Sequence, residues 1–483
     1  MEANSTSRTN LKTNAFGVPS ILFFVFSAQA PLTGIVGASA LTIALGAGAG
    51  TPGIYLAVGA AIILFAVGFT TITRCINTRG GFFAVVRAGL GQRVGTGCSM
   101  LALLSYNTVQ FAMYGLLGAS ISSLLANELS IHISWWVGTL VCIAIVWVLG
   151  SFNIDFGAKI LAVLVSIEFL LLIAFAFGVL FRVGVGGLNL PASFGLHAVL
   201  AGAPGVGIMF AIASMFGFES TAIYAPEARD PEKTVPRATY ISVSIIALFF
   251  TFVIWMLISY YGAGHAVSAA TKSLAGDPSQ FVLAPMTDIL GTWASTTSQV
   301  LLCSSLFAGV LAFHNMVARY FHALGEDRIF PAEIAHTNRW HAPWVASATQ
   351  TVLAVATVII FAANALDPVT TLFTWFSGLS VLALVVLYVV TSIAIVAYFR
   401  RHTLPYRRWN TAFAPALSIV AMAVILYSVL SNFESLIGSS GTLMWSLIAS
   451  VPIAAIIGLV LGGDRLATPH VADVVDTTTV PVD

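Results

Sequence analysis

Long apolar runs, separated by short polar segments, fill the chain from residue 18 to residue 462. A helix that crosses a bilayer needs about 20 consecutive, mostly apolar residues. The pattern predicts twelve such helices, near residues 18–46, 53–73, 95–126, 134–150, 157–183, 199–224, 237–262, 294–324, 344–364, 369–400, 411–431 and 443–462. We therefore predict an all-α integral membrane protein with no separate soluble domain.

The connections between these helices are short. The longest, near residues 263–293, is expected to carry a short helix from Pro278 to Leu290. Polar tails, expected to be disordered, flank the helices at residues 1–17 and 463–483. An alternative for the first apolar run is a removable signal peptide cleaved after Ala30. Pro31 at that point, and the continuation of the apolar run to Gly46, favour a membrane helix.

Composition supports a lipid environment. Charged residues make up 8% of the chain and hydrophobic residues 58%, whereas a soluble domain carries about 25% charge. The net charge of +1 gives no indication of nucleic-acid binding. The four cysteines have no metal-ligand spacing and are interpreted as small buried hydrophobic residues: Cys75, Cys98, Cys142 and Cys303.

Lysine and arginine predict the orientation, because cytoplasmic loops of membrane proteins are rich in both. If the N-terminus is cytoplasmic, Arg182 and Lys272 are the only two of the 20 Lys and Arg residues that fall outside. This asymmetry predicts a multi-pass protein of the cell membrane with both termini in the cytoplasm.

Two predicted helices contain helix-breaking residues at mid-depth. Pro31 and Gly34 interrupt the first helix, and Gly217 lies beside Glu219 in the sixth. Irregular backbone at this depth is tolerated where it lines a cavity, and the exposed helix ends suit the two charges of a zwitterion. Packing kinks are the alternative. Breaks five helices apart also fit an inverted repeat that pairs helices 1–5 with helices 6–10.

Three motifs resemble those of the amino acid–polyamine–organocation (APC) superfamily, most closely its bacterial amino acid permease and putrescine importer branch. They are Phe216-Gly217-Phe218-Glu219 followed by residues 226–231 and 235–238, Gly80-Gly81-Phe82 followed by residues 89–91, and Arg319 followed by residues 323–331. Ala228 and Asp230 depart from the second Glu and the Asn of the first motif. The first break, residues 30–34, lacks the glycine-dense run that many relatives have.

The resemblance implies a LeuT-like fold of two inverted five-helix repeats, at residues 18–183 and 199–400, with two further helices at 411–462. It also implies alternating access and a substrate site between helices 1, 3, 6, 8 and 10. The predicted substrate-binding residues are Ala30, Thr33, Gly34, Ile35, Gly37, Tyr106, Asn107, Gln110, Ser214, Phe216, Gly217, Glu219 and Trp375, with Ser377 a weaker candidate.

Several of these residues have a structural alternative. Glu219 is either a strut that holds the break open or a substrate contact. Tyr106, Gln110 and Tyr114 recur every fourth residue, so they share one face of a helix. That face either lines the substrate path or bonds neighbouring helices together. Phe216 is either a gate or part of the apolar core.

Glu168, His314 and Asn315 are the candidates for proton coupling. By the resemblance, Glu168 falls where some proton-coupled relatives carry a lysine in place of a sodium ion, and His314 lies on a helix that approaches the same site. A carboxyl group and an imidazole together accept and pass protons. The alternative is that His314 is an ordinary core histidine.

No catalytic, nucleotide-binding or metal-binding motif is present in the sequence, so neither an enzyme nor an ATP-driven pump is predicted, and no cofactor is expected. The predicted function is secondary transport of an amino acid or small amine, coupled to protons by symport. An exchanger is the alternative within this class, and a multi-pass enzyme or a channel is the alternative outside it.

Overall fold

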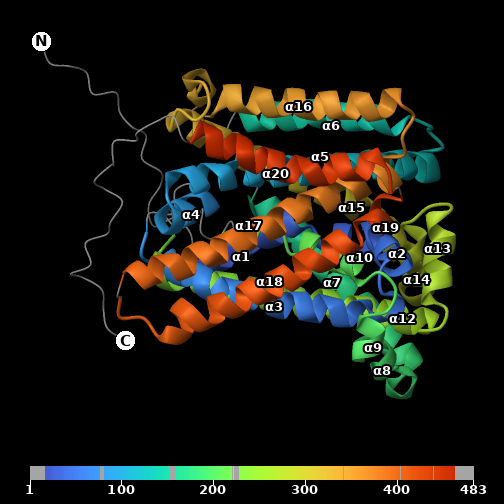
Figure 1. Ribbon diagram of the computed structural model, residues 1–483. Coiled ribbons are helices and arrows are strands. Elements are labelled where there is room, and N and C mark those ends of the chain that lie inside the picture. The colour runs from blue at the N-terminus through green and yellow to red at the C-terminus, as the bar shows by residue number, and fades with distance from the viewer. Residues whose placement is uncertain are drawn as a thin grey trace, which may run out of the picture.

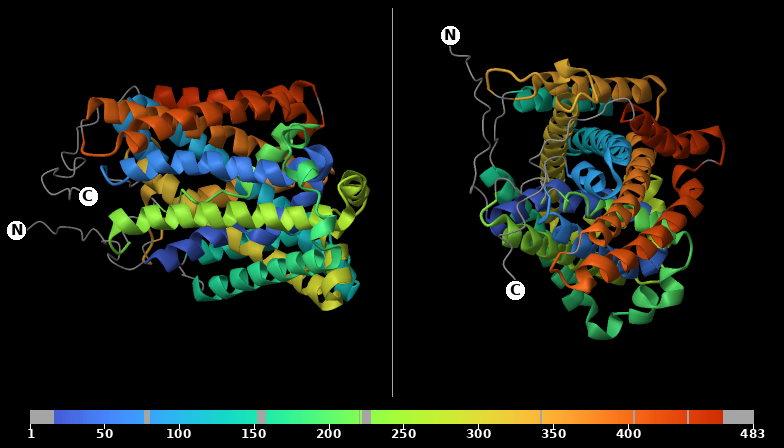
Figure 2. Two further views of the ribbon diagram at one scale, coloured as in Figure 1. Left: turned by 90° about the horizontal axis from the view of Figure 1, so that it is seen from below. Right: turned by 60° about the vertical axis from the view of Figure 1, so that its left-hand side comes forward.

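The computed structural model describes residues 17–76, 81–151, 158–219, 221, 228–340, 342–402, 404–438 and 440–462. The long helices run side by side as one bundle (Figures 1 and 2). Short helices cap the two ends of this bundle: α4 lies at one end, and α8, α9, α13 and α14 lie at the other (Figure 1). We call these the α4 end and the α14 end.

Nine helices in the described residues are long and apolar enough to cross a membrane. They are α3 (Thr51–Ile72), α5 (Gln92–Leu129), α7 (Ala158–Val183), α12 (Pro231–Tyr261), α15 (Thr292–Glu326), α16 (Trp344–Ala363), α17 (Thr374–Arg401), α18 (Ala414–Ser431) and α20 (Thr442–Leu461). A tenth predicted crossing, α6 (Trp135–Ser151), has the same apolar character but is shorter. These ten agree with the predicted segments to within a few residues at most boundaries.

The remaining two predicted crossings are interrupted. The first consists of α1 (Val18–Gln29), the π-helical turn η1 (Thr33–Gly37) and α2 (Ser39–Leu45). The sixth begins with α10 (Pro204–Ala213) and continues as non-helical turns through Glu219. The predicted start of the sixth helix at residue 199 is wrong, because a turn at residues 200–203 precedes Pro204, which opens the helix.

Short elements fill the connections. They are η2 (Gly48–Gly50), α4 (Phe82–Leu90), η3 (Val185–Gly187), α8 (Leu190–Phe194), α9 (Leu196–Val199), α13 (Ala266–Leu274), α14 (Gln280–Leu290), η5 (Ala332–Ala335), η6 (Pro368–Phe373), η7 (Trp409–Phe413) and α19 (Phe433–Ile437). The loop helix predicted near residues 278–290 is confirmed as α14. The segment after the second crossing, treated as a loop in the sequence, forms α4, whose apolar side is buried.

Basic side chains are distributed unequally between the two ends. Arg87 lies on α4, and Arg401, at the end of α17, donates a hydrogen bond to the Gly89 carbonyl oxygen at 3.1 Å. Arg182 ends α7 at the α14 end, where it forms an ion pair with Asp288 of α14. Arg182, one of the two basic residues predicted to lie outside, is thus at the end of the bundle opposite α4.

Small residues allow the helices that carry the site to pack closely. A Cβ at Gly59 of α3 would lie 2.4 Å from the Ala247 Cβ of α12, so these backbones meet where only glycine fits. Nearby, the rings of Tyr55 on α3 and Phe250 on α12 stack with centroids 5.5 Å apart. This tight pair of helices forms one wall behind both interrupted helices.

Candidate functional site

The break in the first crossing centres on two residues. Ala30 has a φ of 44°, a left-handed conformation that costs energy for any residue with a side chain. Pro31 follows it and cannot donate a backbone hydrogen bond. The Leu32 N–H is therefore directed out of the helix and donates to the Glu168 Oε2 of α7, 3.4 Å away. A side chain from another crossing completes this break.

The break in the sixth crossing has a different support. Gly217 has a φ of 99°, which strongly favours glycine. Its N–H donates to the Glu219 Oε2 at 3.1 Å, and the Tyr106 hydroxyl of α5 donates to the Glu219 Oε1 at 3.3 Å. Glu219 is 2% exposed. Its two oxygens therefore hold the turn and bind it to α5.

The two breaks contact each other. The Gln29 Nε2, at the end of α1, donates to the Met215 carbonyl oxygen at 3.4 Å. The hydroxyls of Tyr55 and Ser214 lie 3.3 Å apart. A Cβ on Gly34 would lie 2.4 Å from the Phe250 Cε1 and 3.0 Å from the Ser214 Oγ. Glycine at position 34 thus lets the first break pack against α12 and the second break.

A central cavity lies where the breaks meet. It is lined by Gln29, Thr33, Gly34, Ala38, Val109, Met113, Phe210, Ala213, Ser214, Phe216, Phe313, Phe373 and Ser377. Two polar atoms of this lining, the Gln29 Oε1 and the Thr33 Oγ1, are buried and have no hydrogen-bond partner among the described residues. Because buried polar atoms without partners are rare, both are suited to bind a ligand.

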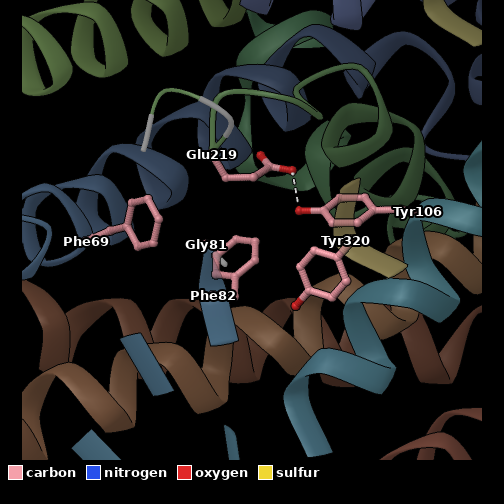
Figure 3. Close-up of a pocket in the computed structure, with 6 residues that line it drawn as sticks. All are labelled: Phe69, Gly81, Phe82, Tyr106, Glu219 and Tyr320. Atoms are coloured by element: carbon pink, nitrogen blue, oxygen red, sulfur yellow. Dashed lines mark hydrogen bonds between the residues drawn. The ribbon is translucent and has the colours of Figure 1, made fainter. Parts of the chain in front are cut away.

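A second cavity, which we call the Glu219 cavity, lies between the central cavity and the α4 end. It is small and is lined by Phe69, Gly81, Phe82, Tyr106, Glu219 and Tyr320. Figure 3 shows the Glu219 carboxylate directed at the Tyr106 hydroxyl, while the Tyr320 hydroxyl points away. The Phe313 ring lies 6.4 Å from the Tyr106 ring and 6.2 Å from the Phe216 ring. These aromatic rings separate the two cavities.

Glu168 connects three crossings. In addition to the bond from Leu32, its Oε2 accepts a hydrogen bond from the Ser305 hydroxyl of α15 at 3.0 Å. Within the part of the chain that the structure describes, its Oε1 is buried without a partner, and the side chain is 0% exposed. Among the described residues, no Lys, Arg or His forms an ion pair with it. Glu168 is thus a buried acid with one free oxygen, bonded to the residue beside Thr33.

His314 and Asn315 lie elsewhere. The His314 Nε2 pairs with the Ser347 hydroxyl of α16 at 2.8 Å, and the Asn315 Oδ1 lies beside Gly150 of α6. His314 is nine positions after Ser305 on α15, which is about 13 Å along the helix axis. The structure therefore does not bring Glu168 and His314 into contact, and the predicted pairing of the two is wrong.

The stripe on α5 divides between two environments. Tyr106 lines the Glu219 cavity, but the Gln110 Nε2 donates to the Val310 carbonyl oxygen at 3.1 Å. The Gln110 Oε1 accepts a hydrogen bond from Gln350 of α16. The Asn107 Nδ2 donates to its own helix at Leu103. Gln110 therefore bonds helices together, whereas the side of α5 that lines the central cavity carries Val109 and Met113.

Four predicted binding residues, Thr33, Gly34, Ser214 and Phe216, line the central cavity, as does the weaker candidate Ser377. Ala30, Ile35, Gly37 and Gly217 shape the breaks behind it, and Trp375 packs on Phe361. The prediction missed Gln29, Ala38, Val109, Met113, Phe210, Ala213, Phe313 and Phe373. Gln29 carried a signal, since it is a polar residue directly before the break, but the apolar residues carried none.

Comparison with known proteins identifies the family. The sequence model of the amino acid permease family matches residues 16–460. The chain belongs to the amino acid permease family. This permease is 24% identical over 159 residues to an L-lysine transport protein of Corynebacterium glutamicum, a match that covers 33% of this chain and 30% of that relative.

The fold is shared with a solved structure. A manganese transporter from Eremococcus coleocola superposes with a TM-score of 0.52 at 14% identity, covering 95% of this chain and 97% of that chain. The predicted LeuT-like fold is thereby confirmed, while the exact repeat boundaries at residues 18–183 and 199–400 stay predictions. Membership of a permease family supports a transporter and not an enzyme, as the sequence predicted.

Proposed function

We propose that this permease is a secondary active transporter of amino acids or closely related amines, driven by proton symport. One observation carries the proposal. Two interrupted crossings meet at a buried cavity, and that cavity presents two polar atoms without partners, the Gln29 Oε1 and the Thr33 Oγ1. Family membership supports the substrate class. The helix ends at the breaks suit the opposite charges of a zwitterion.

In this proposal, the substrate ammonium lies near the end of α10 and the Gln29 Oε1, since both supply acceptors. The substrate carboxylate lies near the backbone N–H groups of residues 33–37. Ser214 lies on the boundary, because its hydroxyl both donates to the Phe210 carbonyl oxygen and pairs with Tyr55. Movement of the interrupted crossings then exposes the cavity to one side of the membrane at a time.

Glu168 carries the proton in this proposal. When ionised, it holds Leu32 and Ser305 by charge-assisted hydrogen bonds, which are stronger than neutral ones. A proton on Glu168 removes the charge and weakens both bonds. Because Leu32 precedes Thr33, the proton alters the segment that binds substrate. His314, paired with Ser347, has a structural role.

We also propose that the α4 end faces the cytoplasm, because it carries most of the basic residues. A cysteine introduced at Ser130, which caps α5 at the α14 end, should then react with an impermeant thiol reagent added outside intact cells. Reaction only after the cells are opened would reverse the orientation.

Uptake into proteoliposomes tests the function. A pH difference, with the acidic solution on the side of the membrane that the protein's outward face meets, should drive uptake. A labelled amino acid should then accumulate above its equilibrium concentration. Accumulation that instead requires unlabelled amino acid on the opposite side, and ignores pH, would indicate an exchanger. No uptake of any amino acid or amine by folded protein would contradict the proposal.

A further inference from the structure

The lining of the central cavity divides into a small polar part and a large apolar part. The polar part comprises Gln29, Thr33, Ser214 and Ser377. The apolar part is dominated by Val109, Met113, Phe210, Phe216, Phe313 and Phe373. The Phe210 and Phe373 rings lie 6.3 Å apart, and those of Phe216 and Phe313 lie 6.2 Å apart.

The polar part is close to the breaks. Gln29 ends α1 and Thr33 begins η1, so both lie on the first interrupted crossing. Ser214 lies directly after α10, on the second. Three of the four polar lining residues, Gln29, Thr33 and Ser214, therefore lie at the breaks, while Ser377 lies on α17. The side chain of a bound amino acid is left with the apolar part.

Among the residues that the structure describes, no Asp, Glu, Lys, Arg or His lines the central cavity. The two carboxylates within the crossings are committed elsewhere. Glu219 lines the other cavity and is bonded through both oxygens (Figure 3). Glu168 bonds Leu32 and Ser305 and is fully buried behind the first break.

A second positive charge on the substrate would find no counter-charge there. Burial of an ammonium group without a carboxylate partner is strongly unfavourable, because the charge loses its hydration. An apolar or aromatic side chain in the same place gains free energy from each buried methylene group and from ring contacts. The lining thus distinguishes neutral side chains from basic ones.

We infer that this permease selects zwitterionic amino acids with apolar or aromatic side chains, such as leucine, methionine and phenylalanine, and rejects lysine and diamines such as putrescine. This inference rests on the proposed transport function. Met113 and Val109, four residues apart on α5, face the cavity together and serve as specificity-determining residues. Gly309 of α15 provides the space for Met113, since a Cβ there would lie 2.3 Å from the Met113 Cε.

The first experiment compares ligands of the wild-type protein. Ligand binding to the folded state alone raises thermal stability, so the purified protein is unfolded by heat with leucine, methionine, phenylalanine, lysine or putrescine. Counterflow in proteoliposomes, with the same compounds, measures transport. Leucine should bind at least about 100-fold more tightly than lysine, a difference of about 2.8 kcal/mol.

The second experiment adds a carboxylate to the apolar part. Met113→Glu should narrow the preference for leucine over lysine by at least about tenfold, relative to Met113→Gln, which has the same shape without the charge. Both variants are first checked for folding by their elution from a sizing column. If Met113→Glu does not fold, the wild-type ligand comparison decides alone.

The possible results distinguish a wrong substrate preference from a wrong transport function. Wild-type protein that binds or transports lysine or putrescine as well as leucine would overturn the inference and leave the transport function standing. Folded wild-type protein that takes up none of the amino acids or amines would overturn the transport function, and the inference with it. An identical preference in folded Met113→Glu and Met113→Gln would show that the substrate side chain lies elsewhere.

Discussion

Glu168 and Glu219 are both buried acids within interrupted or adjoining crossings, but their surroundings differ. Both oxygens of Glu219 accept hydrogen bonds, one from the Gly217 N–H and one from the Tyr106 hydroxyl. Glu168 bonds Leu32 and Ser305 through Oε2, and its Oε1 has no partner in the described parts of the chain. The hydrogen bonds of Glu219 fit a structural strut, whereas Glu168 keeps one oxygen on which the proposed function places a proton.

An amide distinguishes the two positions, because it has one oxygen that accepts and one nitrogen that donates. At Glu168, the amide oxygen can replace Oε2 and the nitrogen can replace the unpartnered Oε1. At Glu219, one amide oxygen cannot accept from both the Gly217 N–H and the Tyr106 hydroxyl, so one of these donors loses its acceptor. The same substitution should therefore lower stability at Glu219 and leave it nearly unchanged at Glu168.

The largest effect on stability is expected for Glu219→Gln. It should lower the free energy of unfolding by about 1–3 kcal/mol, because one buried donor, on Gly217 or Tyr106, loses its acceptor. Thermal unfolding of purified protein measures the change, with Glu168→Gln as the matched control near zero. An equal loss of stability in both variants would contradict the proposed difference between Glu219 as a strut and Glu168 as the proton carrier.

Gly217→Ala is expected to have the next largest effect. A φ of 99° is unfavourable for alanine, so the turn that Glu219 holds should lose about 1–2 kcal/mol of stability. Gly186→Ala is the control, since its Cβ would meet nothing within 4 Å. Wild-type stability in Gly217→Ala would mean that the second break tolerates an ordinary backbone conformation.

Ser305→Ala should cost about 1 kcal/mol, because Glu168 loses one of its two donors. A transport assay distinguishes the surroundings of Glu168 from those of Glu219 further. Ser305→Ala should shift the pH dependence of uptake, whereas Tyr106→Phe, on the Glu219 side, should lower stability without that shift. An unchanged pH profile in Ser305→Ala would place the proton pathway away from Glu168.

Thr33→Val is expected to have the smallest effect on stability. The hydroxyl it removes has no partner, so stability should stay the same or rise slightly. Substrate binding should nevertheless weaken by about tenfold or more, as expected for one lost hydrogen bond to a charged group. Isothermal titration with the transported amino acid measures this. Unaltered affinity would place the substrate outside the reach of Thr33.

The length of the apolar runs in the sequence predicted most of the fold. Ten crossings were placed within a few residues at most boundaries because an uninterrupted apolar run has only one way to satisfy its backbone in lipid. The two breaks were predicted from Pro31 and Gly217, which disturb a helix locally. The sequence analysis did not predict α4, because a nine-residue helix next to glycines is too short to show a clear helical periodicity.

The site was predicted less completely. Polar residues at the breaks, such as Thr33 and Ser214, were found because polarity within lipid is unusual. Val109 and Phe313 were missed, since an apolar side chain in an apolar helix looks the same whether it lines a cavity or packs in the core. The pairing of Glu168 with His314 failed because position along α15 depends on helix packing, which a motif does not specify.

Uptake by Glu168→Gln tests the central claim most directly. The amide mimics a carboxyl group that never releases its proton, and it can keep the bonds to Leu32 and Ser305. The variant should bind substrate and exchange it across the membrane at equal concentrations, but it should not accumulate substrate when only a pH difference is supplied. Accumulation equal to that of the wild-type protein would show that Glu168 is structural and that the proton travels by another route.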